Sequence, residues 1–315
     1  ISSVLMNGNN PPVYEWMLHL LQHWDGFNWQ EARWLSAILV SIGATALWGA
    51  SLKMQNWGAM LSACLFLASA QVMSASHLIR GYALEIGLTC LLLWCTENLV
   101  TQDVDDKRRP PNQHLWMVWA LLIVLMPWVH FYGWLLIFPA ILRINVRRNW
   151  KPLLLASLGL TPLIFHTLNR FASTLEAGVA LDQPHGYPML RDMFVVLNGN
   201  PTLAILALLT CIGSLFLSLK KGLGSQLVWL IPLALYGIGS SYTPMHAPRY
   251  IALFAPYWCH FLGQNLASLI QHTSLQFKRR GLSLPIGTAL GLLCSGFILW
   301  QIQPHPPVYG PLNDA

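Results

Sequence analysis

Charged residues are scarce in this chain. Only 10% of its 315 residues are charged, whereas an average soluble domain is about 25% charged. Thirty charged side chains are too few to coat a soluble protein of this length. The scarcity therefore excludes an ordinary cytosolic enzyme, a disordered protein and a nucleic-acid-binding protein. Hydrophobic residues make up 55% of the chain, which is typical of a protein embedded in a membrane.

Several chemical motifs are also missing. The chain has no glycine loop of the Walker or Rossmann kind, so we expect no ATP or dinucleotide cofactor. Its six cysteines form no CxxC pair and stand at no ligand spacing from a histidine, so we expect buried thiols and no metal site. No signal peptide is recognisable. Because the first residue is Ile1, we expect a removed amino terminus or a fragment.

Long apolar segments dominate what remains. About 20 apolar residues suffice to cross a bilayer, and ten segments approach that length. The segment 114–142 counts as two short helices, with a break at Pro127–His130. The other eight are 32–51, 57–75, 81–97, 152–168, 201–219, 226–240, 250–269 and 284–301. The predicted fold is therefore all-α and polytopic, with about ten transmembrane helices.

The basic residues predict how these helices are oriented, because cytoplasmic loops are enriched in Lys and Arg. If residues 1–31 lie outside, 13 of the 18 Lys and Arg residues fall in inner loops. The five left outside are Arg33, Arg80, Arg170, Arg191 and Arg249. We therefore predict an integral membrane protein with both ends outside, so that orientation explains most of the positive charge.

This topology divides the chain into three parts. Residues 1–31 form an outer loop whose amphipathic run 13–24 predicts an interfacial helix on the outer leaflet. Residues 32–302 form the transmembrane domain, including a long outer loop at 169–200. Residues 303–315 form an outer tail.

Ionisable groups at the edge of a membrane helix are costly and suggest function. Arg80 stands at the outer end of a predicted crossing, and Tyr82 and Glu85 follow on one helix face. Arg249 and Tyr250 stand at the outer end of a later crossing. An arginine there can bind a phosphate group bidentately. The alternative is an arginine that reaches the lipid headgroups and anchors its helix.

Two further places carry polar groups. His130 and Tyr132 stand at the predicted helix break, where freed backbone groups need partners or a water-lined cavity. Pro11 and Pro12 precede Tyr14 at the start of the predicted interfacial helix. The alternatives are a structural histidine and a plain helix start. His166 and His260, inside crossings, are interpreted as packed or hydrogen-bonded side chains.

These four places, in this order, resemble the GT-C class of membrane glycosyltransferases. The resemblance is to the bacterial family related to the Rgt lipopolysaccharide sugar transferases and the protein O-mannosyltransferases. Its members read HPPLYY, SQEARMYAL, THYFGL and RYLL. The matching segments here are Asn10–Glu15 (NPPVYE), Ser76–Leu84 (SHLIRGYAL), Val129–Trp134 (VHFYGW) and Pro248–Ile251 (PRYI).

The resemblance implies a hexosyl- or pentosyltransferase of the bacterial inner membrane, with its active face toward the periplasm. It would move a sugar from a polyprenyl-phosphate donor to a glycan, lipid or protein acceptor. Its other expected partners are membrane lipids, and no nucleic acid is expected. Arg80, Arg249, Tyr82 and Tyr250 would bind the donor phosphate. The residues expected to line the cavity are His130, Tyr132, Glu85, Pro11, Pro12 and Tyr14.

The resemblance also implies a missing part. The family's first membrane helix and its catalytic Asp would precede Ile1, and Leu78 replaces the acidic residue of the SQEAR motif. Within the chain, Glu15 is the candidate catalytic base. The competing hypothesis is a non-catalytic protein that binds or flips a lipid-linked sugar with the same arginines.

Overall fold

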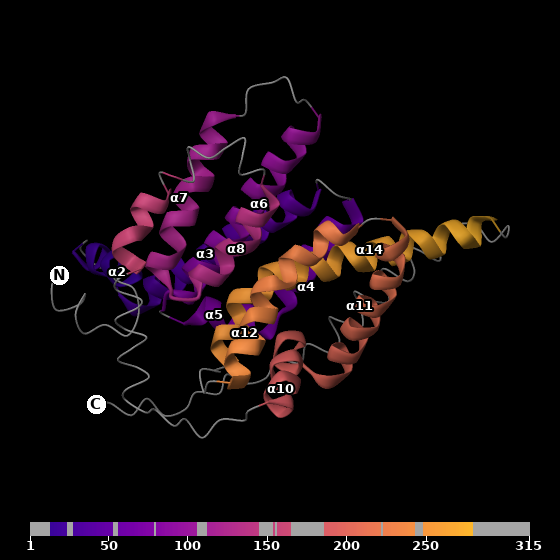
Figure 1. Cartoon of the computed structure of the whole chain (residues 1–315). Helices are drawn as coiled ribbons and strands as arrows, with labels where there is room; N and C mark the ends of the chain where they lie inside the picture. Colours follow the sequence, from indigo (N-terminus) through magenta and orange to yellow (C-terminus); the bar gives the residue numbers. More distant parts are fainter. Residues whose placement is uncertain are drawn as a thin grey trace.

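The computed structural model describes most of the first 279 residues. The described ranges are 13–23, 28–52, 56–78, 80–105, 112–144, 154, 156–164, 186–221, 223–242 and 248–279. Within them, every regular element is a helix (Figure 1), which confirms the predicted all-α class. Pro11, Pro12, the predicted crossing 284–301, the tail 303–315 and most of the loop 169–200 lie outside the described residues.

Two long apolar helices pack along each other in the first half of the chain. Helix α3 (Trp29–Leu52) packs along α6 (Tyr82–Asp105), and each is long and apolar enough to cross a membrane. Glycines allow the close approach of the two helices. A Cβ at Gly43 would stand 3.2 Å from the Cα of Gly87. A side chain at either glycine would push the helices apart.

The predicted crossing 57–75 is bent, which corrects the expectation of one continuous helix. The structure has α4 (Asn56–Ala68) and α5 (Ala70–His77), which meet at an angle of 56°. Ser69 between them adopts an extended conformation, with ψ of 118°. Both helices contact α3, but α4 also packs along the late helix α14 (Ala255–Arg279), whereas α5 contacts α6. Beyond the shared partner α3, the two arms of the bend therefore pack on different helices.

The segment 114–142 forms two helices, as predicted. Helix α7 (Gln113–Val129) and helix α8 (Gly133–Arg143) are separated by residues 130–132. The break begins after Pro127, which lies in the last turn of α7 rather than in the break itself. Gly133 is required at the start of α8, because a Cβ there would stand 2.5 Å from the backbone carbonyl carbon of Met126. The chain therefore turns back tightly at His130.

The second half of the described chain is a series of shorter helices around α14. Helix α10 (Tyr187–Asn198) lies within the predicted outer loop 169–200 and meets α11 (Pro201–Lys221) at 94°. The 3-10 helix η1 (Leu223–Leu230) leads into α12 (Ile231–Tyr242). Helix α13 (Pro248–Ile251) and the 3-10 helix η2 (Ala252–Phe254) lead into α14. Figure 1 shows α14 in orange-yellow beside α4 and α11.

The predicted interfacial segment is helical. Helix α2 (Val13–Gln22) contacts α7, and its Tyr14 is buried while Glu15, His19 and Leu20 are exposed. By length and composition, the described residues contain two helices that could each cross a membrane, or up to four crossings if each bent pair counts as one. The expectation of ten crossings stays a prediction.

Candidate functional site

Aromatic rings from three parts of the chain meet at the first turn of α6. Tyr82 begins α6, His130 and Tyr132 lie at the break between α7 and α8, and Tyr250 lies in α13. The ring centroid of Tyr82 is 5.4 Å from that of His130 and 6.2 Å from that of Tyr250. The Tyr250 ring is also 5.7 Å from His130 and 5.0 Å from Tyr132. Three of the four sequence motifs therefore converge in space.

Both predicted arginines stand at the edge of this cluster. The guanidinium carbon of Arg249 lies 5.3 Å from the centre of the Tyr250 ring, within the range of a cation–π contact. Arg80 and Arg249 both interact electrostatically with the phenol of Tyr82. Both arginines are exposed, whereas Tyr82 is 3% exposed. Among the described residues, neither guanidinium forms an ion pair with a carboxylate.

The backbone of the break orients His130. The Nδ1 atom of His130 accepts a hydrogen bond of 3.2 Å from the backbone N–H of Tyr132. A neutral imidazole that accepts at Nδ1 carries its proton on Nε2. That Nε2 atom is buried and has no hydrogen-bond partner among the described residues. His130 therefore offers an unused N–H donor inside the aromatic cluster.

Tyr14 joins the site from the amino-terminal helix. A Cβ at Gly81 would stand 3.4 Å from the Cβ of Tyr14 and 3.5 Å from the backbone oxygen of Val129. Tyr14 thus packs beside the residues that precede Tyr82 and His130. The neighbouring Glu15 is exposed on α2, and its assignment as a base stays a prediction.

Glu85 is placed differently from the other predicted residues. Its side chain is completely buried, and neither carboxylate oxygen has a hydrogen-bond partner among the described residues. It interacts electrostatically with Tyr257 of α14, deeper in the helix bundle. Glu85 therefore lies in the packed core below the ring cluster, and its part in lining a substrate cavity stays a prediction.

Two aromatic members of the cluster were not expected. The Tyr236 ring in α12 lies 5.3 Å from Tyr132 and 5.0 Å from Phe254 of η2. Both residues belong to apolar segments, so nothing in the sequence distinguishes them from ordinary core residues. Only the packing of α12 against α8 brings Tyr236 to the site.

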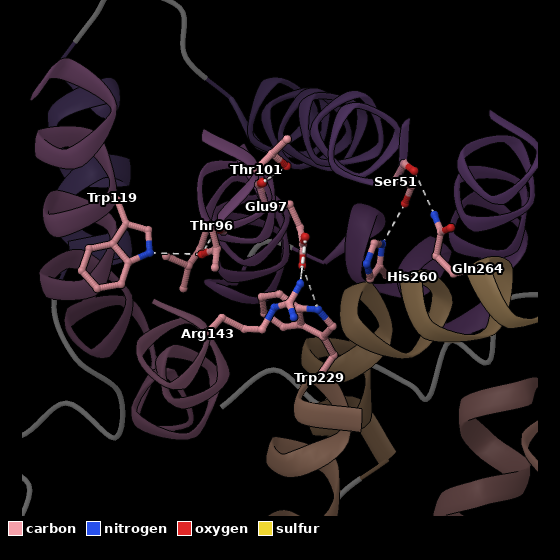
Figure 2. A network of polar contacts seen from close by, with 10 residues as sticks. Ser51, Thr96, Glu97, Thr101, Trp119, Arg143, Trp229, His260 and Gln264 are labelled. Carbon is pink, nitrogen blue, oxygen red and sulfur yellow. Dashed lines mark hydrogen bonds and ion pairs between the residues drawn. The ribbon is translucent and has the colours of Figure 1, made fainter. Parts of the chain in front are cut away.

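A second polar cluster was also missed, deeper along α6. Glu97 accepts hydrogen bonds of 2.8 and 3.0 Å from Nη2 of Arg143, and one of 3.2 Å from Nε1 of Trp229 (Figure 2). The side chain of Glu97 is 4% exposed and that of Arg143 is 11% exposed. Arg143, which was counted among the inner-loop charges, is the last residue of α8 and neutralises this buried carboxylate. The sequence feature that could have indicated this cluster is Glu97 itself, an acidic residue at the end of an apolar run.

His260 lies beside this cluster, as Figure 2 shows. Its Nδ1 is 2.8 Å from the hydroxyl of Ser51, and Gln264 donates a hydrogen bond of 3.0 Å to the backbone oxygen of Ser51. These contacts join α14 to α3 and confirm the interpretation of His260 as a hydrogen-bonded structural residue. His166 lies outside the described residues.

No protein-family model matches the chain, and no curated protein matches it. Its fold is that of a many-helix protein with apolar helices, and it is similar to a solved structure. That structure is ArnT from Cupriavidus metallidurans in the apo state, at a TM-score of 0.55 and 13% sequence identity. The likeness covers 94% of this chain and 63% of ArnT, so the chain spans less than two thirds of its neighbour's length.

Proposed function

We propose that this chain is the greater part of a membrane glycosyltransferase that takes its sugar from a polyprenyl-phosphate donor. ArnT is a glycosyltransferase of the GT-C class, and its fold is similar to that of this chain. That is the class to which the four sequence motifs point independently. The acceptor is a glycan, a lipid or a protein at the outer face of the membrane.

One observation carries the proposal. Arg80 and Arg249 both interact electrostatically with the phenol of Tyr82, and no described carboxylate forms an ion pair with either of them. Both are exposed cations beside one tyrosine, and an anionic ligand at that place would be attracted by both. A phosphate on a lipid carrier has the required charge, and arginine forms bidentate hydrogen bonds to phosphate oxygens.

The same pair of cations would assist the reaction. When the sugar leaves its carrier, negative charge grows on the departing polyprenyl phosphate. Fixed cations placed where charge develops lower the barrier to such a step. The unused Nε2–H of His130 is a further donor beside them. A carboxylate base would deprotonate the acceptor hydroxyl, and Glu15 is the candidate within this chain.

The proposal is tested by removing one cation in the full-length protein. Arg249→Ala should abolish sugar transfer from a radiolabelled polyprenyl-phosphate donor, while the protein stays in the membrane. Arg191→Ala is the matched control, because Arg191 is also exposed and predicted to lie outside but pairs with Asp192 at 3.2 Å. Full transfer by the Arg249 variant would overturn the phosphate-binding role.

A protein that binds or flips the lipid-linked sugar would use the same arginine pair without bond chemistry. The observation that favours this alternative is the position of the candidate base. Glu15 is the only carboxylate on α2, and its side chain is exposed. The two are separated by the product. A transferase releases free polyprenyl phosphate in proportion to acceptor glycosylation, whereas a flippase moves the intact donor between leaflets of a vesicle.

A further inference from the structure

We propose that His19 and His23 of helix α2 form a binding site for a divalent transition-metal ion such as Zn²⁺. The two residues are four positions apart on one helix, and their ring centroids lie 4.6 Å from each other. Residues at i and i+4 stand above one another on one helical face. A pair of histidines with this spacing is the geometry in which a helix chelates zinc. This inference does not depend on the proposed function.

The hydrogen bonding of His23 prepares one nitrogen for a metal. Its Nδ1 lies 2.8 Å from the backbone oxygen of His19. A carbonyl oxygen can only accept, so Nδ1 carries the proton and donates it. The neutral ring then has a free lone pair on Nε2. Metal-binding histidines commonly use their second nitrogen in this way, which fixes the tautomer and the ring orientation.

The pair is open to the aqueous phase. His19, Gln22 and His23 are exposed, whereas Tyr14 on the same helix is buried against the rest of the protein. The buried side holds α2 in place, and the exposed side carries the two imidazoles. No described carboxylate or backbone group other than the oxygen of His19 binds either ring. The site therefore faces solvent beside the predicted outer membrane surface.

The spacing of the rings suits first-row metals. Zn–N bonds of about 2.0–2.1 Å at tetrahedral angles place two ligating nitrogens roughly 3.3 Å apart. Ring centroids 4.6 Å apart are compatible with that separation, and the exposed His19 ring can rotate to reach it while His23 keeps its hydrogen bond. The described residues hold no group of three or more His, Cys, Asp or Glu side chains that would bind a metal. Water or a lipid phosphate would therefore complete the coordination, and imidazole ligands favour Zn²⁺, Ni²⁺ or Cu²⁺ over Mg²⁺.

The test is titration of the full chain, purified without a histidine tag in detergent, with Zn²⁺ followed by calorimetry. One ion should bind per chain, and Mg²⁺ should not compete. His19→Gln and His23→Gln should each weaken binding roughly tenfold or more, because the second ligand no longer acts at high effective concentration. His114→Gln is the matched control, since His114 is exposed in the first turn of α7, and it should bind as the wild type does.

A rearranged variant separates chelation from the mere presence of histidine. The double substitution His19→Gln, Gln22→His keeps two histidines on α2 but places them at adjacent positions, which do not share a face. It should bind as weakly as the single variants. With Cu²⁺, the electron paramagnetic resonance spectrum of the wild type should report two imidazole nitrogens. Wild-type affinity in the rearranged variant, or no saturable binding by the wild type, would overturn the proposal.

Discussion

Removing Arg143 should destabilise the protein strongly, because it would leave the carboxylate of Glu97 buried without a counter-charge. Glu97 is 4% exposed and receives two hydrogen bonds from Arg143 and one from Trp229. In Arg143→Met, only the bond from Trp229 remains. The desolvation of a carboxylate is then no longer compensated.

The magnitude follows from the geometry of the pair. Breaking a buried ion pair by removing one partner costs about 3–5 kcal/mol. At about 2 °C per kcal/mol for a chain of this size, the unfolding midpoint of Arg143→Met should fall by about 6–10 °C. Glu97→Gln should cost less, about 1–3 kcal/mol. Its amide oxygen still accepts from Trp229, and Arg143, at 11% exposed, retains some solvation.

The double variant Glu97→Gln, Arg143→Met tests the reasoning directly. It contains neither charge, so it should be more stable than Arg143→Met alone, although it carries one more substitution. Thermal unfolding in detergent, followed by tryptophan fluorescence, measures all three. The exposed pair Arg191–Asp192 supplies the control, because Arg191→Met should cost under about 1 kcal/mol. Additive losses in the double variant, or a shift for Arg143→Met as small as the control's, would refute the argument.

Three other substitutions have defined outcomes. Gly263→Ala should lower the unfolding midpoint by several degrees, because a Cβ there would stand 2.5 Å from the backbone nitrogen of Ser62 and force α14 away from α4. Asn112→Ala should cost about 1 kcal/mol in the same assay, since Asn112 caps α7 by accepting from the backbone N–H of Leu115; an unchanged midpoint would contradict this role. Tyr250→Ala should weaken donor binding at least about two- to fivefold through loss of a cation–π contact of about 0.5–1 kcal/mol, whereas Tyr250→Phe should lose less, because it keeps the ring over Arg249 and loses only the hydroxyl that hydrogen-bonds Arg249. Equal losses in the two Tyr250 variants would indicate a role for the hydroxyl instead.

Much of the site was predictable because its chemistry is costly in a membrane. Arg80, Arg249 and His130 stand out from apolar surroundings, and each marks the end of a helix or a break. The structure brings their segments together around Tyr82 and Tyr250. Tyr236 and Phe254 give no such signal, because an aromatic residue in an apolar helix is ordinary. Their place depends on which helices pack together.

For the helices too, some features are predictable from the sequence and others depend on packing. Apolar composition by itself predicts an all-helical protein, because backbone groups in lipid must be paired within their own segment. It also predicts the two helices on either side of His130. It does not predict the bend at Ser69, on one side of which α4 packs on α14, while on the other side α5 contacts α6. Nor does it predict that Arg143 is partnered by Glu97, 46 residues away in sequence. Composition and local spacing decide which groups are too polar for lipid, but only the packing of distant helices decides which groups neutralise one another.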